Sequence, residues 1–239
     1  MTFTIAGLTP DPWQLEIVQS EYARRLVLCS RGAGKTESAI VKVARCALIH
    51  DESLILILAP SDRQSMEFLR RVKVHYRRMG EPLGFPIKET EHELILPNSA
   101  RIIALPENER TIRVFQGVDL LVIDEASRVD DDLYHAVTPM LGTSGGSLIA
   151  LTTAFGQRGW FFDAWQKGGD AWQRIKITAL QSSRFAPGFL DNERRSMPLR
   201  DFEREYLCVF HEAEGSVFRP EDIEAAFDTD REPFFGGSD

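Results

Sequence analysis

Short and nearly continuous apolar runs recur along the first three quarters of the chain. They are RLVLCS (25–30), LILILA (54–59), LLVID (120–124), SLIALTT (147–153) and, more weakly, RIKITAL (174–180). Unbroken runs of this length, unlike alternating ones, are typical of strands that are buried on both faces of a parallel sheet. The sequence therefore predicts a central, mainly parallel sheet.

The segments between these runs have helical periodicity. Residues 35–50, KTESAIVKVARCALIH, repeat apolar side chains three and four positions apart, and residues 59–76 begin with a proline and a serine cap candidate. Alternating strands and helices indicate an α/β fold with helices on the faces of the sheet. Residues 86–105 alternate on either side of Pro97-Asn98-Ser99 and predict an inserted β-hairpin. The pattern becomes helical from about Gly188, which predicts a small helical C-terminal segment.

Size and composition are ordinary for a soluble globular protein. The chain has 239 residues, of which 43% are apolar and 27% charged, and this suits one large domain. No apolar run approaches the roughly 20 residues of a membrane span, and the N-terminus does not resemble a signal peptide. We therefore expect the protein to act in the cytoplasm. The three cysteines are far apart and lack C-x-x-C spacing, so neither a disulfide framework nor a zinc site is predicted.

The net charge of −8 argues against a surface that binds nucleic acid over its whole area. A local basic patch is still present on one predicted helix, where five cations lie close together: Arg70, Arg71, Lys73, Arg77 and Arg78. A solvated helix face and a phosphate-contacting face both fit this pattern.

The stretch SRGAGKT (30–36) lies between the first apolar run and the first predicted helix. It fits the end of the phosphate-loop pattern G-x-x-x-x-G-K-[ST], with Cys29 in place of the first glycine. Cys29 needs only a strand conformation if the loop turns after it. In such a loop, backbone N–H groups and the helix N-terminus bind phosphate oxygens. Lys35 would reach the β- and γ-phosphates, and the Thr36 hydroxyl would ligate Mg²⁺. The predicted nucleotide-binding residues of the loop are Ser30, Arg31, Gly32, Ala33, Gly34, Lys35 and Thr36.

A second motif, LLVIDEAS (120–127), is an apolar strand that ends in two acids. An NTPase holds its magnesium-associated aspartate at such a position, and Asp124 fits this role. Glu125 is then placed to orient and deprotonate the attacking water. Together the two motifs predict an ATPase that hydrolyses its nucleotide.

Two weaker features complete the pattern. Gln14, next to Trp13 in DPWQLEIV, is placed to read an adenine edge with its amide, although an ordinary helix start with a core tryptophan fits as well. Thr152 and Thr153 end the strand SLIALTT and could bring hydroxyls near the γ-phosphate, although a strand followed by a glycine-rich turn is the alternative.

In this order, Trp-Gln, SRGAGKT, IRVFQGVDLLVIDEAS, TTAFGQRGWF and FEREYLCVF resemble the ATPase domain of the large terminase subunit, the DNA-packaging motor of tailed bacteriophages. The resemblance covers about residues 10–220. It implies a P-loop NTPase of the additional-strand, catalytic-glutamate type, which hydrolyses ATP with Mg²⁺ to drive double-stranded DNA into a procapsid in the host bacterial cytoplasm.

The resemblance also assigns roles to residues. It implies that Lys35 and Thr36 bind phosphate and Mg²⁺, that Asp124 is the metal-associated acid and Glu125 the catalytic base, and that Thr152 and Thr153 couple hydrolysis to movement. Family motors act as homo-oligomeric rings on a portal, together with a small terminase subunit, and an arginine of a neighbouring subunit completes each site. Arg113 is the first candidate for that arginine, although Val114 follows it where many relatives have glycine; Arg31 is the second and Arg158 a distant third.

The division of the chain follows from the same resemblance. Residues 1–215 are expected to form the ATPase domain and residues 216–239 a linker or tail. Large terminases continue into a nuclease domain, and its carboxylate-rich pattern is missing from this sequence, so no DNA cleavage is expected from this chain. We expect the isolated chain to be monomeric and to hydrolyse ATP slowly. The rival functions are another nucleic-acid motor, such as a helicase or repair ATPase, and a nucleotide-binding assembly module that has lost hydrolysis.

Overall fold

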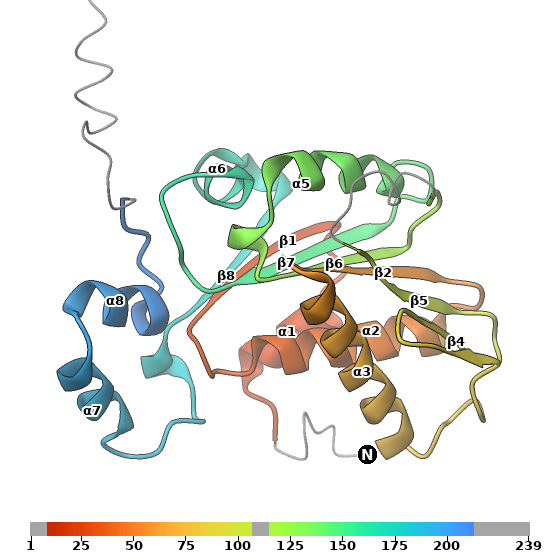
Figure 1. Cartoon of the computed structure of the whole chain (residues 1–239), viewed down its shortest axis with the longest axis horizontal. Coiled ribbons are helices and arrows are strands. Elements are labelled where there is room, and N and C mark those ends of the chain that lie inside the picture. The colour runs from red at the N-terminus through yellow and green to blue at the C-terminus, as the bar shows by residue number, and fades with distance from the viewer. Residues whose placement is uncertain (1–8, 107–114, 213–239) are drawn as a thin grey trace, which may run out of the picture.

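One sheet runs through the centre of the molecule. The structure is a computed structural model that describes residues 9–106 and 115–212. In those ranges, the sheet has eight strands in the order β3-β4-β5-β2-β6-β7-β1-β8 (Figure 1). The strands are β1 (Arg24–Cys29), β2 (Leu54–Leu58), β3 (Lys88–Glu89), β4 (Glu93–Ile95), β5 (Arg101–Ala104), β6 (Leu120–Asp124), β7 (Ser147–Thr152) and β8 (Gln173–Ile177).

Strands β2, β6, β7, β1 and β8 pair with their neighbours in parallel, as the unbroken apolar runs predicted. Strand β5 also pairs in parallel with β2, which the sequence did not predict. Strand β7 lies between β1, which leads into the glycine-rich loop, and β6, which ends in the acids. This inserted strand confirms the additional-strand type of P-loop fold. The register aligns Leu28 with Thr152 and Asp124 with Leu151, so the three strands end together at one edge of the sheet.

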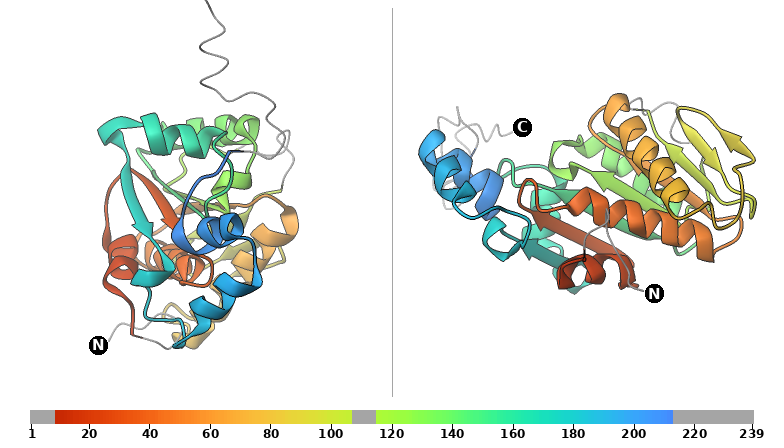
Figure 2. Two further views of the ribbon diagram at one scale, coloured as in Figure 1. Left: turned by 90° about the vertical axis from the view of Figure 1, so that its left-hand side faces the viewer. Right: turned by 90° about the horizontal axis from the view of Figure 1, so that it is seen from below.

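Helices cover both faces of the sheet (Figure 1). Helices α1 (Pro12–Gln19), α2 (Lys35–Ile49) and α3 (Asp62–Arg78) lie on the lower face in that view, and α5 (Asp131–Val137) and α6 (Trp160–Lys167) lie on the upper face. Helices α7 (Phe189–Ser196) and α8 (Leu199–Leu207) form a separate helical unit beyond β8, at the end where the glycine-rich loop lies (Figure 2).

The alternation within β1 shows why the strands need apolar residues at every position. Val27 and Cys29 pack in the cluster beneath α2, whereas Leu26 and Leu28 pack in the cluster beneath α5 and α6, and all four are buried. A strand with helices on both faces has no solvated side. Burial of apolar surface contributes about 25 cal/mol per Å² and is the main stabilisation of such a layer.

The predicted hairpin and C-terminal helices are both present. β4 and β5 are antiparallel and join at Pro97-Asn98-Ser99, but β5 also pairs with β2, so the hairpin extends the main sheet at its edge. Helices α7 and α8 form the expected helical segment, whereas the predicted tail, 216–239, lies outside the described residues. Within the described ranges, no helix combines the length and apolarity needed to cross a bilayer.

Candidate nucleotide-binding site

The glycine-rich loop joins β1 to α2 at the carboxyl edge of the sheet. Cys29 is the last residue of β1, as expected from the displaced first glycine. Gly32 and Gly34 have φ angles of 77° and 101°, a left-handed conformation that favours glycine. A Cβ atom on Gly34 would lie 2.8 Å from Gln14 Nε2, so this position also needs the missing side chain for space.

Two N–H groups of the loop are used by the surrounding fold. The Ser30 N–H donates to the Ile177 carbonyl and the Arg31 N–H to the Glu205 carbonyl, each at 2.8 Å. The loop is thereby fixed from β8 and α8. Helix α2 begins directly after it, at Lys35, and the first N–H groups of a helix have no intrahelical partner. The second half of the loop and the N-terminus of α2 are therefore suited to cradle an anion.

The two sequence motifs meet across this edge. Lys35 Nζ lies 2.9 Å from Glu125 Oε1, and the Thr36 hydroxyl donates to Asp124 Oδ2 at 3.3 Å. Burial works against the charge of Lys35, but the carboxylates of Glu125 and Asp124 outweigh it and raise the pKa of Lys35. Burial raises the pKa of Asp124 to about 6, although Lys35 opposes this shift. The site thus brings two carboxylates and one ammonium group together where solvent is largely excluded.

The oxygen atoms of Thr36 and Asp124 fit a magnesium ion. Neighbouring ligands in an octahedron with metal–oxygen distances of about 2.1 Å are about 3 Å apart, and the two side-chain oxygens are separated by 3.3 Å. Both are hard oxygen donors, which Mg²⁺ prefers. The buried Asp124 would also have its unfavourable charge offset beside a cation. Within the described residues, no group of three or more His, Cys, Asp or Glu side chains is placed to hold a metal.

Glu125 has a left-handed backbone conformation with φ 51°. Such a conformation costs about 1 kcal/mol or more in a residue other than glycine, and it is concentrated at functional sites. The Glu125 N–H donates to Asp124 Oδ1 at 3.1 Å, which fixes the turn between the two acids. The bend directs Glu125 toward Lys35 at the end of the strand.

Thr152 and Thr153 lie at the end of β7, between the two motifs in the sheet, and both are buried. Ser127 connects the acids to them: its hydroxyl lies 2.6 Å from Thr152 Oγ1 and donates to the Thr153 carbonyl at 3.2 Å. Ser127 was not among the site residues predicted from the sequence. The sequence signal that could have identified Ser127 is its position two residues after Glu125, because the turn that carries Glu125 also carries Ser127.

Gln14 is completely buried beside the loop. Its Nε2 donates to the Gly34 carbonyl at 3.3 Å, and its Oε1 accepts from the Asp11 N–H and from Arg184 Nη2, at 3.0 and 3.3 Å. Trp13, its neighbour, belongs to the core cluster under the sheet. The Gln14 amide thus holds the loop, and its reading of adenine stays a prediction.

Arg184 and Phe185 were not expected at the site. Arg184 contacts Gln14 as above, and the Phe185 ring lies 3.4 Å from the position that a Cβ on Gly32 would take. Both residues precede α7 and lie roughly 150 positions from the loop in the sequence. Because no local pattern relates residues so far apart, only the folded chain brings them to the site.

The three candidate arginines have different places. Arg31 is exposed on the loop itself. Arg158 lines a cavity of about 790 Å³ next to Arg128, which stacks on Phe155 with 4.6 Å between the guanidinium carbon and the ring centroid. Arg113 lies outside the described residues.

The basic helix α3 is largely paired within the chain. Arg70 and Arg77 form ion pairs with Glu67 and Glu89, each at 2.6 Å. Arg71 pairs with Glu37, and the Lys73 ammonium donates to the Thr90 carbonyl. These contacts favour a solvated face for this helix over a phosphate-contacting one.

Comparisons with known proteins agree with this geometry. Residues 26–225 match the family described as terminase large subunit, T4likevirus-type, N-terminal. The ATPase domain of the large terminase of Thermus phage P74-26 superimposes with a TM-score of 0.74 at 19% identity, over 86% of this chain and 96% of that one. The large terminase of another thermophilic bacteriophage, in complex with ADP, gives a TM-score of 0.72 at 12% identity. That match covers 84% of this chain and 53% of the second terminase, so this chain spans about half of it. No curated protein matches the sequence.

Proposed function

The chain belongs to the family of terminase large subunits, the ATP-hydrolysing motors of viral DNA packaging, and we propose that it works through the site formed by Lys35, Thr36, Asp124 and Glu125. The contact of Lys35 with Glu125 carries the proposal, because it joins the phosphate-binding loop to the acidic strand. A nucleotide-binding module that had lost hydrolysis would not need to keep both acids beside the loop. A helicase would normally have a second RecA-like domain, and this sequence has one set of phosphate-loop and acidic-strand motifs, which does not favour a helicase.

The chain's own residues divide the chemistry between them. The loop and the N-terminus of α2 bind the phosphates of ATP, and Lys35 exchanges Glu125 for the β- and γ-phosphate oxygens. Thr36 and Asp124 would hold Mg²⁺, which neutralises charge on the phosphates when it is bound. Glu125, released from Lys35, accepts a proton from the attacking water at its carboxylate.

Coupling and assembly extend this proposal. Thr152 and Thr153 respond to the γ-phosphate, and the Ser127 bridge supports this role because it links them to the turn that carries Glu125. The motor acts on double-stranded DNA in the host cytoplasm, as a homo-oligomeric ring with a portal, a procapsid and a small terminase subunit. Arg113, or in its place Arg31, of a neighbouring subunit offsets charge on the transferred phosphoryl group.

The first experiment is a steady-state ATPase assay with and without Mg²⁺ and DNA. Lys35→Ala should abolish nucleotide binding and hydrolysis, while Lys167→Ala, which removes a lysine that is 81% exposed, should leave both intact. Hydrolysis by the Lys35→Ala chain at the parental rate would overturn the proposal. Nuclease activity, which we do not expect from this chain, is read from the same DNA on a gel.

A further inference from the structure

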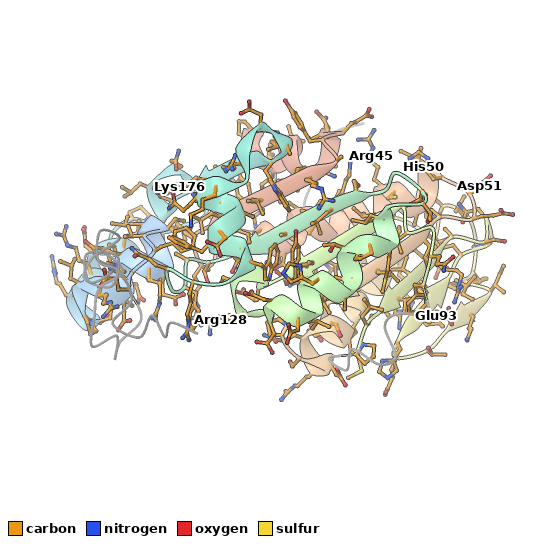
Figure 3. All side chains as sticks on the ribbon, turned by 90° about the horizontal axis from the view of Figure 1, so that it is seen from above. Arg45, His50, Asp51, Glu93, Arg128 and Lys176 are labelled. Carbon is orange, nitrogen blue, oxygen red and sulfur yellow. The ribbon has the colours of Figure 1, made fainter. Side chains whose placement is uncertain are left out.

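A second polar cavity lies at the opposite end of the sheet from the nucleotide site. This basal cavity has a volume of about 710 Å³ and is bordered by the end of α1, the last two turns of α2 and the loop before β7. Figure 3 shows Arg45, His50 and Asp51 at that end of the molecule, with Lys176 and Arg128 toward the other. The volume lies within the range of small-molecule sites, which is about 300–1,000 Å³.

Three cations converge at the wall of the basal cavity: Arg25, Lys42 and Arg45. Each donates to carbonyls at the C-terminal end of α1. Arg25 Nη1 donates to Ser20 at 2.8 Å and Ile17 at 3.3 Å, the Lys42 ammonium to Ser20 at 2.9 Å, and Arg45 to Val18 at 3.3 Å. Within the described ranges, none of the three forms an ion pair.

One helix end does not need three cations. The C-terminus of a helix has a charge equivalent of about −0.5, so three full positive charges exceed it several-fold. Arg25 is completely buried, and its Nε has no hydrogen-bond partner among the described residues. A buried donor without a partner is costly, and so is the buried charge of Arg25, whereas Lys42 is half-buried and Arg45 is exposed. Both costs would fall if an anion entered the cavity.

Three carboxylates line the same cavity: Glu21, Asp51 and Asp119. Asp119 accepts the Leu54 N–H at 2.8 Å, and Asp51 accepts from Asn98 Nδ2 at 3.2 Å. Glu21 is the carboxylate that acts on Lys42, and it acts weakly: burial, followed by repulsion from Arg25 and Arg45, lowers the pKa of Lys42 to about 8. Arg25 and Arg45 therefore act on Lys42 more strongly than Glu21 does.

We propose that the basal cavity is a binding site for a phosphate group, held by Lys42 and Arg45 in the field of the buried Arg25. The cavity is much larger than a single phosphate ion, so it accepts the group either free or as part of a nucleic-acid backbone. The site is separate from the phosphate-binding loop and does not depend on hydrolysis.

The test titrates inorganic phosphate against the whole chain carrying Lys35→Ala, so that the loop is disabled in every sample. Calorimetry gives the Kd and thermal unfolding gives the shift in Tm, at constant ionic strength. Replacing Lys42 and Arg45 by glutamine keeps hydrogen-bond donors for the α1 carbonyls and removes two charges. We expect the Kd for phosphate to rise about ten-fold or more, since hydrogen bonds to charged groups are the strong ones.

The matched control replaces Lys167 and Arg195, which are exposed and remote, by glutamine and should leave the Kd unchanged. If the double variant does not fold, Arg45→Gln alone should give a smaller rise in the same direction. Equal affinity in variant and control, or no saturable binding to the parent, would overturn the proposal.

A second arm uses a short DNA duplex and fluorescence anisotropy. If the double variant loses affinity for both phosphate and duplex relative to the control, the site takes a backbone phosphate. If it loses phosphate binding alone, the ligand is a free phosphate. Neither result bears on the ATPase proposal, which is tested by turnover.

Discussion

Replacing Glu125 by glutamine separates the two roles that the structure and the proposed mechanism give this residue. Its Oε1 lies 2.9 Å from Lys35 Nζ, and in the proposed mechanism its carboxylate accepts the proton of the attacking water. Glutamine keeps the size of the side chain but removes both the charge and the basicity. We therefore expect binding and turnover to change in opposite directions.

The gain in binding follows from the ion pair. Coulomb's law at 2.9 Å with an effective dielectric constant of about 20 gives about 6 kcal/mol. The Glu125 side chain is 25% exposed, so solvation offsets most of this, and about 1.5 kcal/mol, typical of a charged hydrogen bond, remains for ATP to overcome. Glu125→Gln releases Lys35 and should lower the Kd for ATP by up to about ten-fold.

The loss in turnover follows from the missing base. A positioned general base contributes about 10²–10⁴ in rate, so kcat should fall by that factor. Binding is measured with a fluorescent ATP analogue and hydrolysis by phosphate release. Glu67→Gln is the control, because it removes a carboxylate from an exposed ion pair on α3. Unchanged turnover would refute the assignment of the base, and weaker binding would refute the competition for Lys35.

Three further predictions concern the surroundings of the site. Ser127→Ala should keep ATP binding but reduce the DNA-dependent part of hydrolysis, because it breaks the 2.6 Å contact with Thr152. The control is Ser144→Ala, which removes a hydroxyl that donates to the remote Val118 carbonyl. An equal effect of both substitutions on hydrolysis would argue against coupling through Ser127. Asp124→Asn should stabilise the metal-free protein at pH 7 by roughly 1–3 kcal/mol in urea unfolding. Burial raises the folded-state pKa of Asp124 from 3.8 to about 6, so the free energy of unfolding of the parent falls as the pH rises through that interval. This destabilisation is complete at pH 7, and the gain in stability from Asp124→Asn should vanish near pH 4. Gly34→Ala should lower Tm and abolish nucleotide binding, since its Cβ would lie 2.8 Å from Gln14 Nε2, whereas Gly145→Ala, with φ +66 and open space around it, reports the backbone strain alone.

The parts of the fold that depend on local pattern could be predicted from the sequence. Unbroken apolar runs indicated the parallel strands, and the order of loop, acids and threonines indicated the edge where they meet. Cys29 shows that the position of a residue in the fold determines whether a glycine is needed. It ends strand β1, where a buried residue other than glycine is suitable, so the strand does not need the missing glycine. The sequence predicted the hairpin but not the pairing of its strand β5 with β2, because the sequences of two distant strands do not show that they are neighbours in the sheet.

The contacts made by long-range folding could not be predicted. Arg184 and Phe185 reach the loop only because β8 returns beside β1 and places the following segment over it. The pairing of α3 arginines with Glu67, Glu37 and Glu89 was also hidden, since a charge pattern shows the cations on a helix but not which acids they contact.

The nucleotide loop is held in place from two directions, and this follows from its position at the sheet edge. On one side Lys35 and Thr36 bind the acids at the end of β6. On the other, the Arg31 backbone N–H donates to the Glu205 carbonyl of α8, and Phe185, which packs on Tyr206 of that helix, lies over Gly32. In the proposed mechanism, the phosphates break the contact of Lys35 with Glu125, whereas the backbone bond to α8 can persist. We therefore expect a shift of the loop to move the helical unit of α7 and α8 with it.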